Sequence, residues 1–350
     1  MVQAFLLVVC LALFAALPII VSGLPTTPQT VSSGTTYLVL DVDAGADDAI
    51  AILLALGEEK RNPNLKVVAI TCVHGNTALD NVVNNVLKTL KTAGRLDIPV
   101  YRGASKSLRI TPPGDEYFGK DGFGDFEYPD APKVEDYLQK DHAVDALVRL
   151  SKEYKGKLTV LALGSLTNLG LAIRMAPDFL KNVNVAILGG STEGVGNIKP
   201  GVEFNFFMDP EANFIVFNST TKETNPITLI PWETCKERNK ITVRWRKNEL
   251  GTINSEKINL INKAEGKILT NEPDNAQWVS ADPMAAAVVV NPSLVTSNIT
   301  HNVAAETEGD YGRGAIFVDY NDVRPVKNTV IIKNIDVEAY KTWLKENLSS

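Results

Sequence analysis

The sequence predicts an α/β fold: a doubly wound, mostly parallel sheet with flanking helices, built as a single domain. Two observations support this fold class. Short apolar runs typical of buried strands alternate with helical patterns from residue 37 onward. The chain has 350 residues, enough for one large core, and neither an internal repeat nor a low-complexity linker divides it.

The expected elements follow one another in strand–helix order. The first strand is expected over residues 37–40 with its helix over 47–56, and a second strand over 66–71 precedes a helix over 77–93. Further strands are expected over 158–163, 184–188 and 227–230, and further helices over 169–176 and 281–290. Thr167 and Asn168 stand just before the helix over 169–176, so both are expected to cap it.

The first 24 residues carry no charged side chain, and residues 4–21 form an apolar run followed by Ser22 and Gly23. This pattern predicts a signal peptide over residues 1–23, a flexible segment over 24–35 and the main domain over 36–350. An uncleaved anchor is the alternative, because an apolar run of this length is close to the lower limit for crossing a bilayer. We expect cleavage, and therefore a secreted protein without a stable membrane anchor.

Export agrees with three glycosylation acceptor patterns, which begin at Asn218, Asn298 and Asn347. Once the leader is removed, two cysteines remain, and Cys72 and Cys235 either form a disulfide or stay as buried thiols. The net charge of −6 provides no basic surface, so we expect no nucleic-acid partner.

Residues 111–132 lack periodicity and are rich in glycine, proline, aromatic and acidic residues. A long irregular segment in a compact α/β domain is often a lid over a functional site. An ordinary surface excursion is the alternative, and composition alone does not separate the two.

Four aspartates follow the first expected strand within eight residues: Asp41, Asp43, Asp47 and Asp48. Ligands of open parallel sheets bind beyond the carboxyl ends of the strands, which makes this turn a candidate site. Carboxylates packed so closely repel one another, and a hard divalent cation such as Ca²⁺ or Mg²⁺ relieves the repulsion. Asp47 and Asp48 could instead complement a helix N-terminus, but that alternative leaves Asp41 and Asp43 unexplained.

A strand that ends in Asp-x-Asp also resembles the haloacid-dehalogenase-type phosphatases, in which the first Asp is a nucleophile and Mg²⁺ is bound. Those enzymes usually have Thr or Val where this chain has Gly45, and they are not expected to carry the Asp-Asp pair that follows. The phosphatase reading is therefore the weaker one.

Later turns give a more specific resemblance. Residues 73–77 read Val-His-Gly-Asn-Thr, 163–168 Leu-Gly-Ser-Leu-Thr-Asn, 194–197 Gly-Val-Gly-Asn, 202–205 Val-Glu-Phe-Asn and 281–283 Ala-Asp-Pro. With the aspartate cluster, this ordered series resembles the inosine-uridine-preferring nucleoside hydrolase family, as a secreted eukaryotic-type member, over residues 37–344. The resemblance implies an N-glycosyl hydrolase that splits a ribonucleoside into ribose and a free base, and it implies a homo-oligomer.

The resemblance also implies a single Ca²⁺ at the base of a ribose pocket. Asp43, Asp48 and Asp282 would be its side-chain ligands, and the backbone carbonyl of Leu163 would be another. Asp43 would in addition be the general base toward the water held at this site.

The remaining roles that the resemblance implies concern the sugar. Asp47 and Asn205 would hold the 2′- and 3′-hydroxyls, and Asn197 and Glu203 would reach the 5′-hydroxyl. Asn76 would lie beside both metal and ribose. Asp41 would support the turn from behind.

The sequence departs from the family at the base. Many members carry a histidine just before the late aspartate, as the acid that protonates the leaving base, but this chain has Ala281 there. A second family histidine is replaced by Phe118, which leaves His74 as the only histidine near an expected sheet end. The missing imidazole keeps a non-catalytic nucleoside- or calcium-binding relative open as an alternative.

Some purine-preferring members sandwich the base between aromatic rings, so that solvent can protonate it. Trp278 is the main candidate for such a ring, with Trp232 and Phe118 as further ones, whereas Trp245 and Trp343 are expected to pack in the core. We therefore expect a preference for purine nucleosides.

Overall fold

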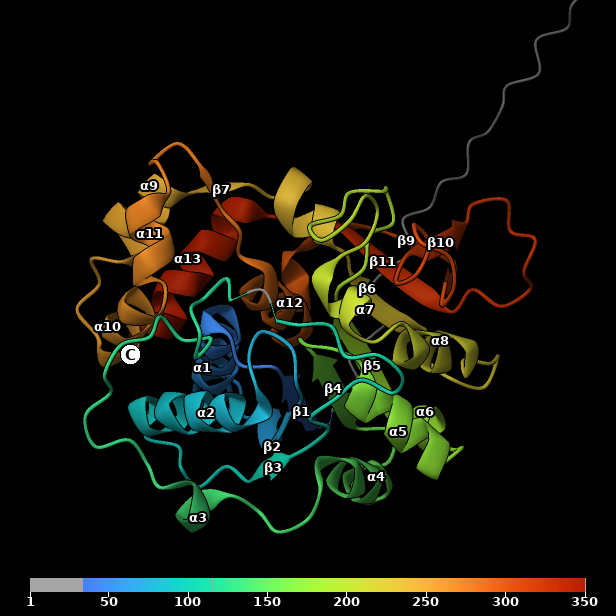
Figure 1. Cartoon of the computed structure of the whole chain (residues 1–350), viewed down its shortest axis with the longest axis horizontal. Helices are drawn as coiled ribbons and strands as arrows, with labels where there is room; N and C mark the ends of the chain where they lie inside the picture. Colours follow the sequence, from blue (N-terminus) through green and yellow to red (C-terminus); the bar gives the residue numbers. More distant parts are fainter. Residues whose placement is uncertain (1–33, 115, 350) are drawn as a thin grey trace, which may run out of the picture. The chain divides into compact units, whose positions relative to one another are not determined.

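A nine-stranded sheet runs through the described part of the protein, residues 34–114 and 116–349 of the computed structural model (Figure 1). Its strands lie in the order β10-β9-β11-β6-β5-β4-β1-β2-β3. Their bounds are β1 Thr36–Val42, β2 Leu65–Cys72, β3 Val100–Arg102, β4 Leu158–Ala162, β5 Val183–Leu188, β6 Ile227–Ile230, β9 Val295–Ala305, β10 Ile316–Asp319 and β11 Thr329–Ile335.

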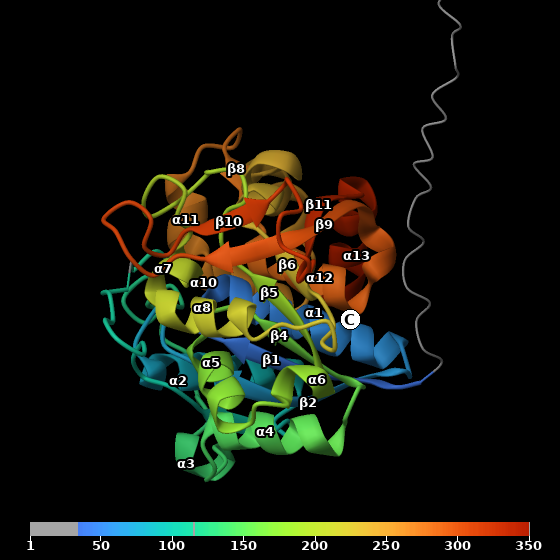
Figure 2. The ribbon, with the colours of Figure 1, turned by 90° about the vertical axis from the view of Figure 1, so that its right-hand side faces the viewer.

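Neighbouring strands from β11 to β3 are all parallel, which confirms the predicted mostly parallel sheet. The remaining two pairings are antiparallel: at one edge of the sheet, β9 pairs with β11 on one side and with β10 on the other (Figure 2). β1 lies between β2 and β4, so the chain winds outward from β1 in both directions. The carboxyl ends of β1 and β4 therefore form the crevice in which doubly wound sheets bind ligands.

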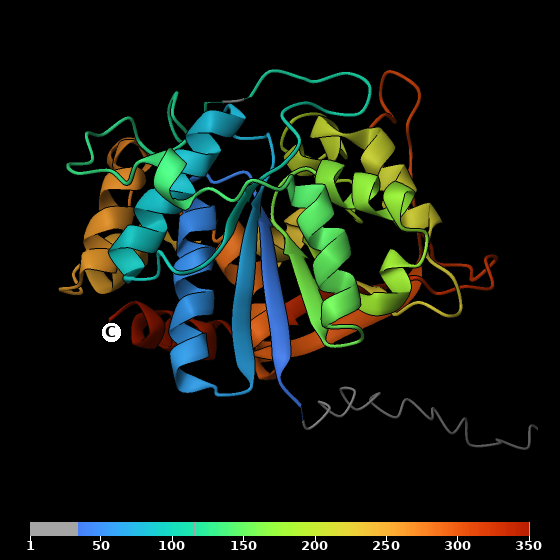
Figure 3. The same cartoon turned by 90° about the horizontal axis from the view of Figure 1, so that it is seen from below.

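Helices cover both faces of the sheet (Figure 3). Leu38, Leu40 and Val42 of β1 pack on one face and Val39 on the other, as the two-residue period of a strand requires. The first face is covered by α1 Ala46–Arg61, α2 Leu79–Ala93, α10 Glu256–Ala264, α12 Ala281–Val290 and α13 Val337–Leu348. The second is covered by α4 Ala143–Glu153, α5 Thr167–Met175, α6 Phe179–Asn182 and α8 Pro210–Asn218.

Short elements complete the described chain. The helical ones are α3 Val134–Tyr137, α7 Phe204–Met208, α9 Val243–Trp245, α11 Gly266–Asn271, the π-helices η1 Thr234–Arg238 and η2 Arg246–Leu250, and the 3₁₀ turn η3 Pro292–Leu294. A separate two-stranded ribbon pairs β7 Ile241–Thr242 with β8 Gln277–Trp278. The described residues of the range 103–133, which leaves out residue 115, contain neither helix nor strand, so the expected irregular segment is present and extends past both predicted ends.

The two helices that matter most for the site, α1 and α12, pack against each other on the first face. Alanine and branched apolar residues dominate both helices; α12 is buried along nearly its whole length, and α1 is buried as far as Gly57. Such sequences pack closely because small side chains let the helix axes approach. The pairing places the first turns of α1 and α12 side by side.

The predicted leader over residues 1–23, and residues 24–33 of the flexible segment, lie outside the described residues. In the part of the chain that is described, no helix combines the length and apolar character needed to cross a membrane. Cys72 and Cys235 are both buried, free thiols.

Thr167 and Asn168 do not cap α5, and this prediction is wrong. The N-cap of α5 is Leu166, which makes no side-chain cap hydrogen bond. The Nδ2 group of Asn168 instead donates to Asp41 Oδ1 at 2.7 Å and to the carbonyl of Cys72 at 3.1 Å, while its Oδ1 accepts from Ala104 N at 2.9 Å. Asn168 thus ties the ends of β1 and β2 to the turn after β3.

Thr167 belongs to a second buried polar network, which includes His74. The Thr167 hydroxyl donates to Asp209 Oδ2 at 2.6 Å, and His74 Nε2 lies 3.2 Å from the same hydroxyl and 3.4 Å from that of Ser165. Burial lowers the pKa of His74 to about 4, so the ring is neutral at pH 7. The imidazole therefore helps to hold the ends of β2 and β4 together and is not charged.

The His74 environment predicts how stability depends on pH. The unfolded chain takes up a proton near pH 6.5, whereas folded His74 resists protonation down to about pH 4. The free energy of unfolding should therefore fall as pH drops through this window, with a contribution of up to about 3 kcal/mol from this residue. Denaturant unfolding at a series of pH values should show a flatter profile for His74→Asn than for the wild type. Identical slopes for the two proteins would contradict the assignment.

Candidate active site

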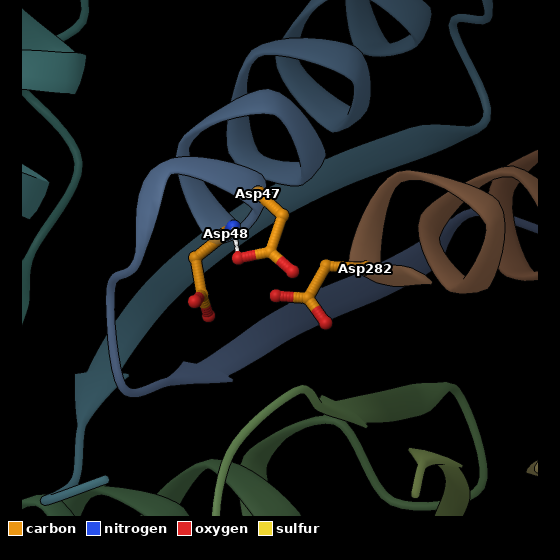
Figure 4. Close-up of side chains that lie close together, drawn as sticks. All are labelled: Asp47, Asp48 and Asp282. Carbon is orange, nitrogen blue, oxygen red and sulfur yellow. Dashed lines mark hydrogen bonds between the residues drawn. The ribbon is translucent and has the colours of Figure 1, made fainter. Parts of the chain in front are cut away.

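Five aspartates meet at the carboxyl end of β1. Asp41 lies within β1 and Asp43 directly follows it, while Asp47 and Asp48 open α1 and Asp282 opens α12. All are buried except the half-buried Asp47. The carboxyl groups of Asp47, Asp48 and Asp282 point toward a common space between the two helix N-termini (Figure 4).

Asp48 is the centre of this cluster. Its Oδ2 accepts a 2.8 Å hydrogen bond from Gly45 N, and its carboxyl group lies at hydrogen-bonding distance from those of Asp43 and Asp282. Its other oxygen, Oδ1, is buried without any hydrogen-bond partner. One oxygen each of Asp47, Asp48 and Asp282 lie within 4.8 Å of one another, a spacing that suits ligands of a single ion.

Burial and mutual repulsion raise the pKa of these carboxyl groups. Desolvation is the largest cause for each, followed by the charge of Asp48 for Asp43 and of Asp47 for Asp282, and the pKa of Asp48 itself rises to about 6. In the described chain, no lysine or arginine forms an ion pair with any member of the cluster.

The N-termini of α1 and α12 supply only fractional positive charge. A divalent cation that prefers oxygen ligands would neutralise the negative charge that the helix N-termini leave uncompensated, and it suits the set of carboxylate and carbonyl oxygens. The orphaned Asp48 oxygen is one such donor.

Asp43 is held from the turn after β2. Asn76 donates its backbone N–H to Asp43 Oδ2 at 2.9 Å and its side-chain Nδ2 to Oδ1 at 3.3 Å. The turn approaches closely because residue 75 is glycine: a Cβ there would overlap the Asp43 carboxylate. On the other side, a Cβ on Gly164 would come within 2.9 Å of Asp43 Cβ, so the turns after β2 and β4 clamp Asp43 between them.

Asp41 is held by residues of β2 and α5. Its Oδ1 accepts from Thr71 Oγ1 at 2.5 Å and from Asn168 Nδ2 at 2.7 Å. Desolvation by burial is the main reason why its pKa rises to about 7.

The turn after β4 and the start of α7 bring three further expected residues together. The Leu163 carbonyl accepts a 2.7 Å hydrogen bond from Asn205 Nδ2, which leaves this carbonyl a second lone pair. Glu203 caps α7, because its carboxylate accepts from Asn205 N, Phe206 N and Gly190 N. Burial nevertheless raises the pKa of Glu203 to about 7.

Two expected residues lie apart from the cluster. Asn197 is exposed in a tight turn, where its backbone N–H donates to Val202 O at 3.2 Å. Trp278 is 4% exposed on β8, and its Nε1 donates to Glu265 Oε1 at 2.7 Å. Glu265 in turn pairs with the fully buried Arg246 and is close enough to Asp47 to raise the pKa of that carboxyl group.

The surroundings expected to contact the base are apolar. Ala281 is buried at the start of α12, next to Asp282. A Cβ placed on Gly45 would lie 2.8 Å from a ring carbon of Phe118 and 2.6 Å from Asn76 Nδ2, so the Phe118 ring borders the aspartate turn. Trp232 is half-buried after β6, and its backbone N–H donates to Gly190 O at 2.9 Å.

Sequence reasoning missed several buried polar residues around the site. Glu265 and Arg246 form an ion pair beside Trp278, Asn85 bonds to the aspartate turn, and Glu233 follows β6 with one carboxylate oxygen lacking a partner. Arg246 and Glu265 stand among other charged residues in sequence, so only the fold distinguishes them. Asn85 could have been found from the sequence, because a polar residue on the apolar face of the expected helix over 77–93 indicates a buried side chain with a specific hydrogen-bonding role.

Comparisons with known proteins agree with this geometry. Residues 38–342 match the model of the family described as inosine-uridine preferring nucleoside hydrolase. The chain is 33% identical over 309 residues to the inosine-uridine preferring nucleoside hydrolase of Leishmania major, covering 87% of this chain and 94% of that protein. It is 31% identical to the pyrimidine-specific ribonucleoside hydrolase RihA of Enterobacter sp. (strain 638), covering 89% of this chain and 97% of the relative.

A solved inosine-guanosine nucleoside hydrolase superposes with a TM-score of 0.81 at 28% identity, covering 89% of this chain and 98% of that one. These matches overturn both the phosphatase alternative and the non-catalytic alternative. Because the family match spans nearly all of the described residues, the chain belongs to the inosine-uridine preferring nucleoside hydrolases and is an enzyme that hydrolyses the N-glycosidic bond of nucleosides.

Proposed function

We propose that this protein is a secreted, calcium-dependent nucleosidase that releases ribose and a free base, with a preference for purine nucleosides. The observation that carries the calcium assignment is the cluster of buried carboxylates around Asp48, which has an orphaned oxygen and no cationic side chain as a partner in the described chain. Oxygen-only donors at this spacing favour Ca²⁺ over transition metals.

Asp43, Asp48, Asp282 and the Leu163 carbonyl would hold the ion. When bound, it would stabilise negative charge and make a neighbouring water more acidic. Asp43 is then the general base, because Asn76 and the flanking glycine turns fix its carboxylate at the edge of the cluster.

The ribose would lie above the cluster. Asp47, the most accessible of the five aspartates, and Asn205 would bind the 2′- and 3′-hydroxyls. Asn197 and Glu203 would bind the 5′-hydroxyl, for which the Glu203 carboxylate keeps acceptor capacity beyond its three backbone donors. The carboxylates around the sugar would stabilise the positive charge that develops as the bond to the base breaks.

Asp43→Asn tests this mechanism. The amide keeps the shape of the side chain but cannot accept the proton, so ribose release should fall by at least about a thousandfold. Product assays of purified wild type and variant measure this loss, and Asp80→Asn, an exposed carboxylate on α2, is the matched control. Wild-type activity in Asp43→Asn would refute the role of Asp43.

The metal is checked in the same preparations: Ca²⁺ should raise the melting temperature of the wild type but not that of Asp48→Asn. No effect of Ca²⁺ on the wild type would refute the calcium assignment.

The purine preference rests on the aromatic ring of Phe118 beside Gly45 and on the absence of an imidazole at Ala281. Stacking on an aromatic ring favours the larger purine surface and delocalises charge on the departing base. Trp278 would be a second ring only if the base reached its buried face, and the bond to Glu265 fixes its orientation.

A nucleoside panel tests this preference. kcat/KM should be higher for inosine and adenosine than for uridine, and Phe118→Leu should lower the inosine value by about threefold to tenfold. Phe123→Leu is the control, because Phe123 is fully buried in the same apolar cluster. A wild-type enzyme with a strong uridine preference would contradict the proposal.

Secretion is supported by the apolar leader and by the accessibility of two of the three acceptor asparagines. Asn218 and Asn298 are exposed, whereas Asn347 is fully buried and donates to Trp343 O at 2.9 Å. Expression in a eukaryotic host should therefore yield a medium-borne protein that begins near residue 24. Peptide mapping should find glycans on Asn218 and Asn298 only. A cell-retained protein that keeps residues 1–23 would contradict this localisation.

A further inference from the structure

The middle of the irregular segment, residues 118–125, is docked firmly on the molecule. Phe118 and Phe123 are buried in a small apolar cluster with Ala46 and Ala49 of α1 and Leu260 and Ala264 of α10. Gly119, Gly122 and Gly124 all have positive φ angles, which lets the segment turn tightly enough to reach this position. We call residues 118–125 the docked loop.

One side chain links the docked loop to the aspartate turn. Asn85 of α2 is 1% exposed, and its Nδ2 group donates to the carbonyl of Ala44 at 3.1 Å and to the carbonyl of Asp121 at 2.7 Å. Ala44 lies between Asp43 and Gly45, at the centre of the turn that carries the cluster. A single amide therefore satisfies one carbonyl from each segment.

The orientation of this amide is fixed on its other side. Asn85 Oδ1 accepts from Lys88 Nζ at 3.4 Å, and the same ammonium group lies 5.6 Å from the centre of the Phe123 ring. Lys88 thus contacts both the bridging residue and the docked loop, and it directs the Nδ2 hydrogens of Asn85 toward the two carbonyls.

The aspartate turn needs such support. Ala44 has φ 33°, a left-handed conformation that is strained for a residue with a Cβ. The surrounding contacts must hold the strained turn in place, and the Asn85 bond to the Ala44 carbonyl is one of them. Loss of this bond would release the backbone between Asp43 and Asp47.

We propose that Asn85 is a positioning residue for nucleoside hydrolysis, which couples docking of residues 118–125 to the conformation of the aspartate turn. When the docked loop leaves, Asn85 loses one of its two partners and the turn loses part of its restraint. When the docked loop is in place, the turn is held with Asp43 and Asp47 in their working positions. Closure over the substrate and assembly of the catalytic carboxylates are thereby one event.

A neighbouring residue provides a matched control. Asn81, one turn earlier on α2, donates to Thr77 Oγ1 at 2.9 Å and reaches the Lys120 carbonyl of the docked loop at 3.5 Å. It therefore helps to anchor the docked loop, but its described contacts do not include the aspartate turn. Comparison of Asn85 with Asn81 separates coupling from simple anchoring.

Asn85→Asp tests the proposal, because it keeps the shape of the side chain but replaces both donated hydrogens by an acceptor. Hydrogen exchange followed by mass spectrometry should show faster exchange in residues 43–48 and in residues 118–125 together. kcat/KM for a nucleoside should fall by about tenfold to a hundredfold. Asn81→Ala should accelerate exchange only in residues 118–125 and change kcat/KM by less than about threefold.

Three outcomes would overturn the coupling: unchanged exchange of residues 43–48 in Asn85→Asp, wild-type kcat/KM in that variant, or an equal effect of Asn81→Ala on both segments. Asn85→Ala replaces Asn85→Asp if the latter does not fold. If neither variant folds, hydrogen exchange of the wild-type protein is measured at increasing denaturant concentrations. This gives the opening free energies of residues 43–48 and of residues 118–125. A common opening free energy for the two segments supports the coupling, and separate values refute it. The exchange readout needs no bound metal or substrate, so it fails independently of the calcium assignment.

Discussion

Repulsion among the buried carboxylates at the carboxyl end of β1 is the main constraint that the surrounding structure has to satisfy. Asp43, Asp48 and Asp282 are withdrawn from water without a cationic side chain as a partner in the described chain. Such an arrangement is costly unless other groups in the fold hold the charges in place. The packing of α1 against α12 does so, because it points two helix N-termini at the same space and leaves both helices buried. A change in that helix interface would act on the site without touching any aspartate.

A second layer of polar residues keeps the cluster in register behind the sheet edge. Asn168 joins Asp41 to the ends of the neighbouring strands, and Asn76 holds Asp43 from the turn after β2. Donors from Thr71, Asn168 and Asn76 satisfy one oxygen of Asp41 and both oxygens of Asp43. Asp41 Oδ2 and Asp48 Oδ1 are buried without a hydrogen-bond partner. The layer behind the site is therefore satisfied only in part by the protein itself, and the unmet acceptor capacity at Asp48 lies within the carboxylate cluster, where an ion would bind.

The parts of the fold that the sequence predicts well are those whose burial is continuous along the chain. β6 and α12 match their expected bounds residue by residue, because a short, mostly apolar run leaves little choice of environment. β9 was missed because most of it is only half-buried and Asn298 and His301 interrupt its apolar residues.

Within the site, the aspartates lie at or next to the ends of the strand and the two helices that the sequence predicts there. The partners of Asn168 could not be predicted in this way. Asp41 is 127 residues away in sequence, and only the strand order brings the two side chains together. Local capping rules therefore predicted a helix cap at Asn168, whereas its side chain makes a tertiary contact with Asp41.

The two halves of the site are built from different kinds of structure, and this difference bears on specificity. The half that would bind ribose and metal rests on strand ends and the first turns of two buried helices, where a shift of one side chain would disturb the core. The half that would face the base includes Phe118 of the docked loop, and Trp278 is held by Glu265, which in turn pairs with Arg246. Loops tolerate substitution better than strand ends do, so base preference can change while the hydrolytic machinery is kept. In this chain the two halves still meet, because Glu265 acts electrostatically on Asp47 and Asn85 bonds to both the docked loop and the aspartate turn. A substitution made to alter base preference should therefore be judged by its effect on kcat as well as on KM, since movement of the docked loop reaches the carboxylates through Asn85.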